Sequence, residues 1–317
     1  MRHSLLLLLL LCAACRSPSH SPSITQFEKI AMEMKYKILI GETLDSQQKR
    51  SAERIIADTF YEIDTVFNNW NPDSEISRLN KLPAGKKVVI SEKLTSLFRQ
   101  INQLHLLTNG RFDPTVEPLA QLWKTRLRND KLPSDEELGK IHPAIGWKKV
   151  HIEEGLFWKD HRLTAIDLGG IAKGLCVDLL ATRLEKAGYS NLFVEWGGEI
   201  RTVGRHPKGR KWNVAIAGIT TIEMENPSIA TSGDYLQAWT VDGTTYTHII
   251  DPITKKPLEV TPGSITSATI VAKSCTFADG LATALMLFHT AKEAAELASA
   301  LPEVRCWVAE QPPLSKN

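Results

Sequence analysis

The hydrophobic pattern changes character near residue 191, and this change restricts the fold more than any other feature of the sequence. Before it, apolar residues recur mainly at the spacing of amphipathic helices. From 191 to 272, short runs rich in β-branched and aromatic residues, such as NLFVEW and SATIVA, are broken by Gly, Pro and Asp. Helices and strands do not alternate in a strict βαβ order. We therefore predict an α+β fold with mixed or antiparallel sheets and packed helices, rather than a doubly wound sheet.

Apolar spacing and capping residues also predict individual elements. Ser91 is a candidate N-cap, Ser134 and Glu137 have capping-box spacing, and Gly188 is a helix stop. The predicted helices cover about 52–69, 91–110, a short stretch from Ser134, 172–188, and two late helices within 277–300 that separate near His289. Strands are expected at 35–40, within 150–166, and through the 191–272 region.

The first residues predict an exported lipoprotein. Arg2 precedes an apolar run from Leu5 to Leu11, which is too short to cross a bilayer and is typical of a signal peptide. Ala13 and Ala14 directly before Cys15 resemble a lipobox, so we expect a signal over 1–15, a Ser/Pro-rich tether over 16–27 and a folded domain over 28–310. The chain would then be anchored through Cys15 on the periplasmic side of a bacterial inner membrane. Ordinary cleavage to a secreted product is the alternative.

Charge and cysteine content exclude some classes of protein. The 38 basic residues include Arg2 of the predicted signal and face 36 acidic residues, so the mature chain carries a formal charge of +1. This balance, with no run of Lys and Arg, argues against a nucleic-acid partner. Cys176, Cys275 and Cys306 remain after processing without a CxxC spacing. They indicate no zinc site, and the sequence selects no disulfide among them.

The segment DLGGIAKG, residues 167–174, is a candidate phosphate site between a predicted strand and a predicted helix. Gly169 and Gly170 allow close approach of the backbone to a ligand, and the N-terminus of the following helix offers free N–H groups. Lys173 adds a cation. The segment matches neither a Walker loop nor the GxGxxG fingerprint, and a turn of this kind can also serve packing alone.

Asp279 and Thr283 are four residues apart in FADGLATAL and share one face of the predicted late helix. A carboxylate and a hydroxyl are hard oxygen ligands for Mg²⁺. Because the set is incomplete, backbone carbonyls, water and substrate phosphates can supply the rest. Taken alone, the pair is also compatible with Asp279 capping the helix and Thr283 bonding to its own turn.

His248 and Asp251 flank the end of a predicted strand in THIIDP. Histidine titrates near neutrality and can accept a hydroxyl proton, and our hypothesis is that Asp251 orients it. A purely structural hydrogen bond between the two is the alternative. Trp70 could stack on a planar ring, or be a half-buried tryptophan at a helix end.

Seven ordered motifs between about residues 30 and 290 resemble the ApbE family of FAD:protein FMN transferases. They are NPDSEISRLN, GRFDPTVEPLAQLW, AIDLGGIAKG, VEWGGEI, ATSGDY, THIIDP and ADGLATAL. The resemblance implies a two-lobed single domain with a T-fold-like build. Two places depart from the family pattern. Met32-Glu33-Met34 stands for an MGT-like start, and Lys255-Lys256 occupies a turn where the family usually has Gly.

The resemblance also assigns roles to residues of this chain. It implies Mg²⁺ bound by Asp279, Thr283 and the backbone carbonyl of Gly170, with His248 near the reacting hydroxyl. It implies contacts with FAD, the substrate, at Met32, Trp70, Arg111, Phe112, Asp113, Asp167, Lys173 and Ile250.

The implied reaction is transfer of the FMN moiety of FAD to a Ser or Thr hydroxyl of a partner protein, such as a subunit of a membrane redox complex, with release of AMP. Two alternatives stay open from the sequence. A magnesium-dependent FAD pyrophosphatase would use the same site with water as the nucleophile. A lipoprotein that only binds FAD would need no open metal site.

Overall fold

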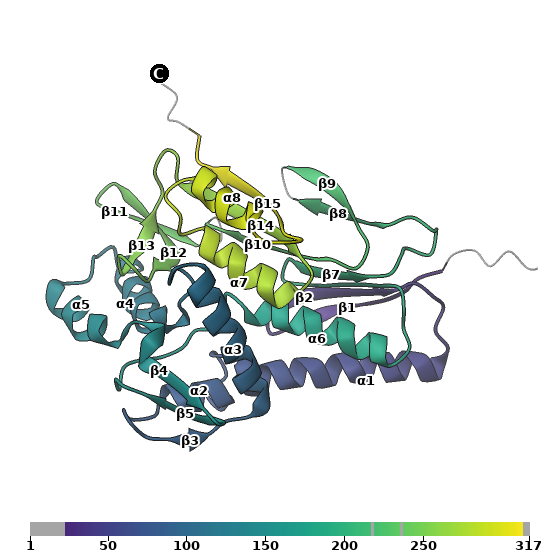
Figure 1. Ribbon diagram of the computed structural model, residues 1–317, viewed down its shortest axis with the longest axis horizontal. Coiled ribbons are helices and arrows are strands. Elements are labelled where there is room, and N and C mark those ends of the chain that lie inside the picture. Colours follow the sequence, from purple (N-terminus) through teal and green to yellow (C-terminus); the bar gives the residue numbers. More distant parts are fainter. Residues whose placement is uncertain (1–22, 217–218, 235–236, 313–317) are drawn as a thin grey trace, which may run out of the picture.

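A computed structural model describes residues 23–216, 219–234 and 237–312 (Figure 1). The predicted signal peptide, Cys15 and most of the predicted tether lie outside these residues. The first strand begins at Thr25, so the predicted tether of 16–27 overlaps the folded domain by three residues. The reason is the alternation of TQFEKIA, which buries Thr25 and Phe27 against the rest of the sheet.

The largest sheet is antiparallel throughout and runs in the order β1-β2-β6-β7-β10-β14-β15. Its strands are β1 (Thr25–Ala31), β2 (Met34–Ile40), β6 (Leu192–Trp196), β7 (Glu199–Val203), β10 (Ser228–Gly233), β14 (Ile265–Ala272) and β15 (Arg305–Glu310). Three smaller sheets contain β3 (Val88–Val89), β4 (Val150–Glu153) and β5 (Leu156–Lys159); β8 (Trp212–Ile216) and β9 (Thr220–Met224); and β11 (Ala238–Val241), β12 (Thr244–Asp251) and β13 (Lys256–Glu259).

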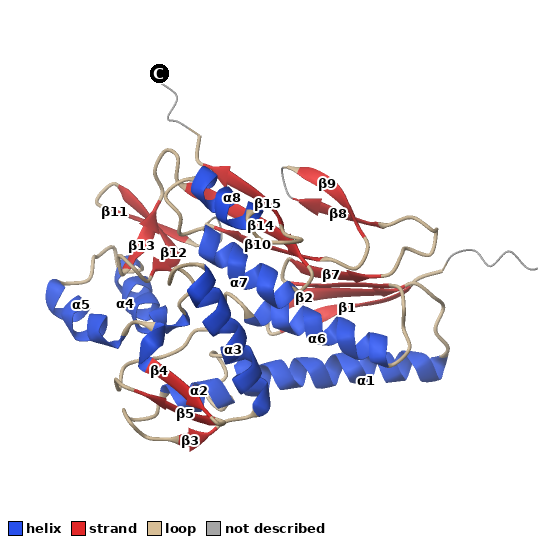
Figure 2. Ribbon diagram, in the orientation of Figure 1, coloured by secondary structure: helices blue, strands red, loops and turns tan. Residues whose placement is uncertain are grey.

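Helices cover one face of the large sheet (Figure 2). They are α1 (Ser46–Glu62), continued by a π-helix (Ile63–Phe67), α2 (Glu75–Asn80), α3 (Glu92–Leu107), α4 (Glu117–Leu127), α5 (Asp135–Ile141), α6 (Ala172–Lys186), α7 (Cys275–Leu285) and α8 (Ala291–Ser299), with short 3-10 turns at Pro114–Val116, His142–Ala144 and Trp147–Lys149. The predicted α+β class, with antiparallel sheets and packed helices, is confirmed.

Three hydrophobic clusters hold the layers together. The main core lies between the large sheet and α1, α3, α6 and α7. A second cluster joins α4 to β11 and β12 through Leu119, Trp123 and Ile250. The β8–β9 hairpin covers the opposite face of the large sheet, where Val214 and Met224 pack near Val271. The site described below lies where the α4 and α7 regions meet the strands.

Local sequence signals account for most of the helix boundaries. Ser91 caps α3, and Ser134 with Glu137 forms the predicted capping box of α5. Gly188, at φ +99°, follows α6 as predicted. The late helical stretch divides at Thr290, which caps α8. The sequence analysis did not identify α2, α4 or β15.

The strands predicted within 150–166 are confirmed as β4 and β5, but the last piece, directly before the DLGG bend, is not a strand. After β5 the chain is irregular, and its polar groups are satisfied by side chains rather than by a neighbouring strand. Ile166 N–H donates to Asn80 Oδ1 at 2.8 Å, and Asn80 Nδ2 donates to the Ile166 carbonyl at 2.9 Å. Asp167 N–H donates to the Pro114 carbonyl. These hydrogen bonds hold the residues before the bend in place without pairing to a neighbouring strand.

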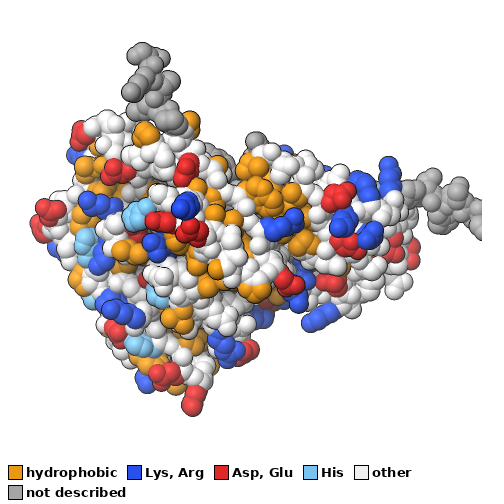
Figure 3. Space-filling view, turned by 45° about the horizontal axis from the view of Figure 1, so that its top comes forward, with side chains coloured by type: hydrophobic (Ala, Val, Ile, Leu, Met, Phe, Trp, Pro, Cys, Tyr) orange, Lys and Arg blue, Asp and Glu red, His pale blue; other side chains and the backbone are white. Residues whose placement is uncertain are grey.

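The surface and the cysteines complete the description. On the face drawn in Figure 3, acidic and basic side chains are interspersed, as expected for a formal net charge of +2. Cys176, Cys275 and Cys306 are all free thiols, and the first two are buried. Within the part of the chain that the structure describes, no helix has the length and apolar character needed to cross a bilayer.

Candidate active site

Asp279 and Thr283 share one face of α7, as their spacing predicts, and that face meets the 167–174 bend. Asp279 Oδ2 accepts a hydrogen bond from Gly174 N–H at 2.9 Å, and Thr283 Oγ1 lies 3.4 Å from the Gly170 carbonyl oxygen. Ser232 Oγ, at the end of β10, lies 3.1 Å from Thr283 Oγ1. Residues more than 100 positions apart in sequence therefore bring a carboxylate, a hydroxyl and a carbonyl oxygen together.

Gly174 permits this close packing of α6 on α7. A Cβ atom at Gly174 would overlap the carbonyl oxygen of Cys275 and lie 2.8 Å from Cβ of Asp279. At Gly170 a Cβ would lie 3.0 Å from Thr283 Oγ1. Any larger residue would push α7 away from the bend, so the two glycines set the distance between the candidate metal ligands.

Lys173 lies between two buried carboxylates. Its Nζ is 3.2 Å from Glu199 Oε1 and 3.5 Å from Asp279 Oδ1, and it donates to the Gly169 carbonyl at 3.3 Å. Burial alone would lower the pKa of Lys173, but the Asp279 and Glu199 charges outweigh burial and raise it above its ordinary value. The cation is thus held charged beside the helix N-terminus, where a phosphate oxygen could contact it.

Glu199 is a site residue that the sequence analysis quoted within VEWGGEI but did not single out. Its side chain is 1% exposed, and Oε2 has no hydrogen-bond partner within the described part of the chain. Burial raises its pKa to about 8; the Lys173 ammonium opposes this shift, and the Asp279 charge adds to it. The unpaired Oε2 is a buried polar atom beside Lys173 and Asp279 that the described residues do not satisfy.

His248 lies on β12, close enough to Lys124 of α4 for that charge to act on it. Its Nδ1 is 3.3 Å from the Gln237 carbonyl oxygen. Because a carbonyl can only accept, Nδ1 carries the proton and Nε2 keeps a free lone pair. Burial lowers the pKa of His248, while the Gln237 hydrogen bond and the Asp234 charge partly oppose this shift. The ring is therefore neutral near pH 7, which is the form that can accept a proton.

The structure does not bring Asp251 to His248, so the hypothesis that Asp251 orients this histidine needs correction. Asp251 Oδ1 accepts from Ile253 N–H at 2.8 Å, and Oδ2 accepts from Thr254 Oγ1 at 2.9 Å. The pairing of β12 with β13 is irregular between Tyr246 and Ile250, so simple alternation does not describe the strand at His248. Asp251 shapes the β12–β13 turn instead, and Asp234 and Asp167 are the carboxylates whose charges act on His248.

The β12–β13 turn also explains how Lys255 can stand where the family usually has Gly. This residue has φ +60°, a left-handed conformation that glycine adopts more easily. Lys255 Nζ donates to the His142 carbonyl at 3.1 Å, and its backbone N–H donates to the Asp251 carbonyl at 2.7 Å. The turn therefore keeps its shape without glycine.

A second wall of the site combines an aromatic ring with ionisable groups. The Trp70 side chain is 75% exposed, and Lys124 Nζ lies 5.1 Å from its ring centroid. Burial raises the pKa of Asp167. Burial, followed by the Asp167 charge, raises the pKa of Glu117 to about 7. The open ring of Trp70 offers a surface on which a planar ring system could stack.

The Arg111-Phe112-Asp113 segment mainly supports the fold. Asp113 Oδ1 accepts from Thr115 N–H and Oγ1, and Oδ2 accepts from Trp147 N–H at 2.8 Å. Phe112 is buried beside α7. Arg111 stacks over Phe288 at 4.1 Å and donates to the Leu287 carbonyl. The side chains at 112 and 113 are therefore occupied by internal contacts.

Of the other predicted FAD contacts, Met32 lies in the β1–β2 connection and Ile250 lies in β12. Met32 and Glu33 form the β1–β2 turn with φ values of +46° and +64°, a left-handed pair without glycine. Such strain is unusual for two side-chain-bearing residues. Ile250 is buried against α4. Met34 Sδ approaches Gly197, whose position also borders the stem of Lys173, so the hairpin reaches the Lys173 region.

The donor set at the bend fits a magnesium ion. Asp279, Thr283 and the Gly170 carbonyl offer only hard oxygen atoms, and Mg²⁺ keeps several positions for water or substrate phosphate. Among the described residues, no three His, Cys, Asp or Glu side chains gather into a ready-made metal site. A metal here would therefore depend on backbone and substrate oxygens, as the incomplete pair in the sequence predicts.

Some site residues carry no recognisable local signal. Ser232, Asp234, Glu117 and Lys124 approach the site only through tertiary packing. The first three lie inside motifs quoted above, ATSGDY and GRFDPTVEPLAQLW. Only their position within family motifs could have identified them.

Comparisons with known proteins identify the family of the chain. The ApbE family profile matches residues 32–308. FAD:protein FMN transferases of Chlamydia muridarum and Vibrio cholerae are 39% and 34% identical, covering 93% and 88% of this chain and 93% and 85% of their own lengths. The solved flavin transferase ApbE from Vibrio cholerae superposes with a TM-score of 0.79 at 30% identity, covering 93% of this chain and 98% of that one. The apo flavinyl transferase ApbE of Pseudomonas stutzeri gives a TM-score of 0.81 at 27% identity over 92% of both chains. The chain belongs to the ApbE family.

Proposed function

We propose that this chain transfers the FMN moiety of FAD to a Ser or Thr hydroxyl of a partner protein in a magnesium-dependent reaction that releases AMP. The observation that carries the proposal is the meeting of Asp279, Thr283 and the Gly170 carbonyl beside Lys173. The names of the Chlamydia muridarum and Vibrio cholerae relatives support the same activity.

The residues at the bend would hold the metal and the pyrophosphate. Asp279, Thr283 and the Gly170 carbonyl would bind Mg²⁺, which supplies charge neutralisation on the phosphate oxygens when bound. Lys173 and the N-terminus of α6 would hold phosphate oxygens in place. Trp70 would stack on one of the planar rings of FAD. Positioning and electrostatic stabilisation then account for most of the rate enhancement.

His248 would act as the general base. The acceptor hydroxyl oxygen attacks the phosphorus on the FMN side, a new O–P bond forms, and the bond from that phosphorus to the bridging oxygen breaks. AMP leaves with the bridging oxygen. The hydroxyl proton passes to Nε2 of His248, whose Nδ1 stays bonded to the Gln237 carbonyl.

One experiment tests the reaction class and the metal together. The purified protein is incubated with FAD, Mg²⁺ and a candidate acceptor, and the acceptor is inspected for flavin fluorescence in a denaturing gel. A labelled band that disappears with EDTA is the expected result. AMP formed without a labelled band would identify a pyrophosphatase instead. Intact FAD that stays bound after chelation would identify a binding protein.

The location of the chain is a separate proposal. We propose that it is exported and held on the periplasmic side of the bacterial inner membrane by acylation of Cys15, where it would meet a membrane redox-complex subunit as acceptor. The Ala-Ala-Cys sequence after the short apolar run supports this. Fractionation tests it: Cys15→Ser should move the protein from the membrane to the soluble fraction. Unchanged membrane attachment would contradict it.

A further inference from the structure

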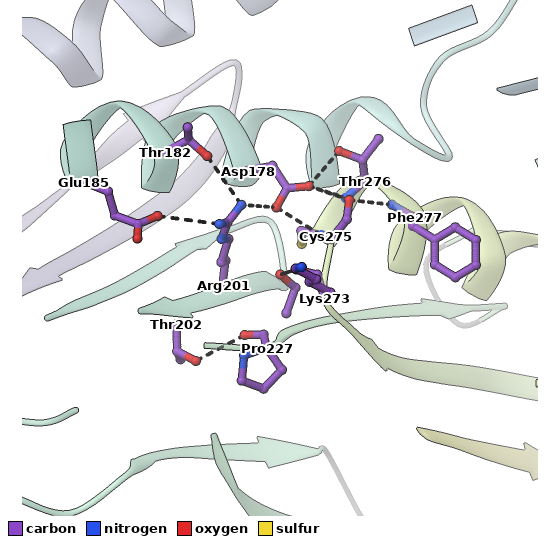
Figure 4. A network of polar contacts seen from close by, with 12 residues as sticks. Asp178, Thr182, Glu185, Arg201, Thr202, Pro227, Lys273, Cys275, Thr276 and Phe277 are labelled. Carbon is purple, nitrogen blue, oxygen red and sulfur yellow. Dashed lines mark hydrogen bonds and ion pairs between the residues drawn. The ribbon is translucent and has the colours of Figure 1, made fainter. Parts of the chain in front are cut away.

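Asp178, on α6, accepts hydrogen bonds from the first turn of α7. Its Oδ2 receives Ser274 Oγ at 2.8 Å, Thr276 N–H at 2.9 Å and Thr276 Oγ1 at 2.8 Å, and Oδ1 receives Cys275 N–H at 3.1 Å (Figure 4). These N–H groups are among those that a helix leaves unpaired at its start. One carboxylate therefore closes the N-terminus of α7 from a neighbouring helix, in addition to the Ser274 cap.

Arg201 forms an ion pair with the Asp178 carboxylate. Its guanidinium lies 2.9 Å from Asp178 Oδ1 and 3.5 Å from Glu185 Oε2. Arg201 belongs to β7, the strand that also carries Glu199. Figure 4 shows Asp178 between Arg201 and the first residues of α7. The start of α7 is thus attached to both α6 and the large sheet.

These attachments fix α7 one helical turn before its site residues. Thr276 precedes Asp279 by three positions, and Thr283 follows one turn later. On α6, Asp178 follows Gly174 by one turn, and Gly174 N–H already donates to Asp279 Oδ2. Two contacts one turn apart determine both the position of α7 along its axis and its rotation. A slip of one residue would shift Asp279 by about 1.5 Å and turn it by about 100°.

We propose that Asp178 is a positioning residue for the metal site. It holds α7 in register with the 167–174 bend, so that the Asp279 carboxylate and the Thr283 hydroxyl face the Gly170 carbonyl. This inference rests on the metal site of the proposed function, because it concerns the geometry of the same ligands. Asp178 itself contacts neither the bend nor the candidate ligands, and it acts only through the start of α7.

The test measures metal binding directly in three variants of the purified full chain. Asp178→Ala removes all the contacts to α7. Asp178→Asn keeps one carbonyl oxygen as an acceptor but replaces the other oxygen with an NH₂ group, which cannot accept from the donors of α7. It is the variant to be measured if Asp178→Ala does not fold. Asp45→Ala is the matched control, because Asp45 Oδ1 caps α1 through Gln47 and Gln48 N–H. Mn²⁺ affinity is followed by electron paramagnetic resonance, well below the Tm of each variant.

We expect Asp178→Ala to weaken Mn²⁺ binding by about 10- to 100-fold, Asp178→Asn to weaken it less, and Asp45→Ala to stay within about twofold of wild type. The Mg²⁺ concentration for half-maximal transfer should rise by the same factor, with kcat largely recovered at saturating Mg²⁺. A merely structural role would lower the Tm of both alanine variants and leave the metal affinity unchanged.

Two negative results have different meanings. Wild-type affinity for Mn²⁺ in both folded Asp178 variants would overturn the positioning role and leave the proposed function standing. Failure of the wild-type chain to bind Mn²⁺ both alone and in the presence of FAD, which would supply phosphate oxygens, would remove the metal site itself, and with it both proposals.

Discussion

The two walls of the site differ in how firmly they are held. On the α6–α7 wall, Asp279 is 1% exposed and bonded to Gly174 N–H, and Thr283 lies against Gly170. At His248 and Trp70, called the looser wall below, the His248 ring has a single long contact to a carbonyl oxygen, and Trp70 is 75% exposed. A preformed wall suits the part of a substrate that is identical in every turnover. A looser wall suits an acceptor that must enter and leave.

The largest effect is expected from a substitution that removes the Asp279 charge at the centre of the firm wall. Asp279→Asn keeps an acceptor for Gly174 N–H but takes away the carboxylate that would bind Mg²⁺. Transfer should fall by about 10³-fold, and Mn²⁺ binding should be lost, because the remaining donors are neutral. Steady-state transfer and metal titration check this, with Asp58→Asn at an exposed position of α1 as the control. Metal binding that survives would place the metal elsewhere.

The next effect concerns the looser wall. His248→Ala should slow transfer by about 10²-fold while FAD affinity stays near wild type, since only the proton acceptor is removed. Asp251→Ala is the matched variant on the same strand, and it should leave the transfer rate nearly unchanged, because Asp251 bonds to its own turn. Single-turnover transfer and FAD fluorescence titration separate the two steps. An unchanged rate in His248→Ala would remove this residue from the mechanism.

The firm wall was the easier one to predict from sequence. Asp279 and Thr283 share a helix face by spacing alone, and a glycine-rich bend before a helix is recognisable without a structure. What spacing could not supply is the partner at long range. Nothing local shows that Glu199 lies beside Lys173, or that Asp178 closes the start of α7.

The looser wall was predicted less well for the same physical reason. His248 and Asp251 are neighbours in sequence, but the Asp251 carboxylate bonds to the β12–β13 turn and not to the histidine ring, so proximity in the chain was misleading. On the firm wall, the segment before the bend was wrongly predicted to be a strand because it is apolar at Ile166. The N–H and carbonyl groups of Ile166 instead form hydrogen bonds with the Asn80 side chain. Asn80 belongs to α2, a helix that the hydrophobic pattern did not reveal.

A smaller effect tests whether the firm wall depends on close packing. Gly174→Ala should lower the free energy of unfolding by about 2 kcal/mol, because the added methyl group overlaps the Cys275 carbonyl. Gly139→Ala is the matched control: it lies in α5 with open space around it, and it should stabilise by about 0.5 kcal/mol. Urea denaturation measures both. Equal stability of the two variants would show that α7 can move away from the bend at little cost.

The smallest expected effect is a shift in pH dependence on the looser wall. Burial lowers the pKa of His248 below its ordinary value of 6.5, so transfer should decline only as the pH falls below that value and the ring becomes protonated. The Asp234 carboxylate favours the protonated ring, and the Lys124 ammonium disfavours it. Asp234→Asn should therefore move the acid limb of kcat/KM to lower pH, and Lys124→Met should move it to higher pH, each by a fraction of a pH unit. Because the two charges act in opposite directions, a shift of the same sign in both variants would show that a group other than His248 sets the limb.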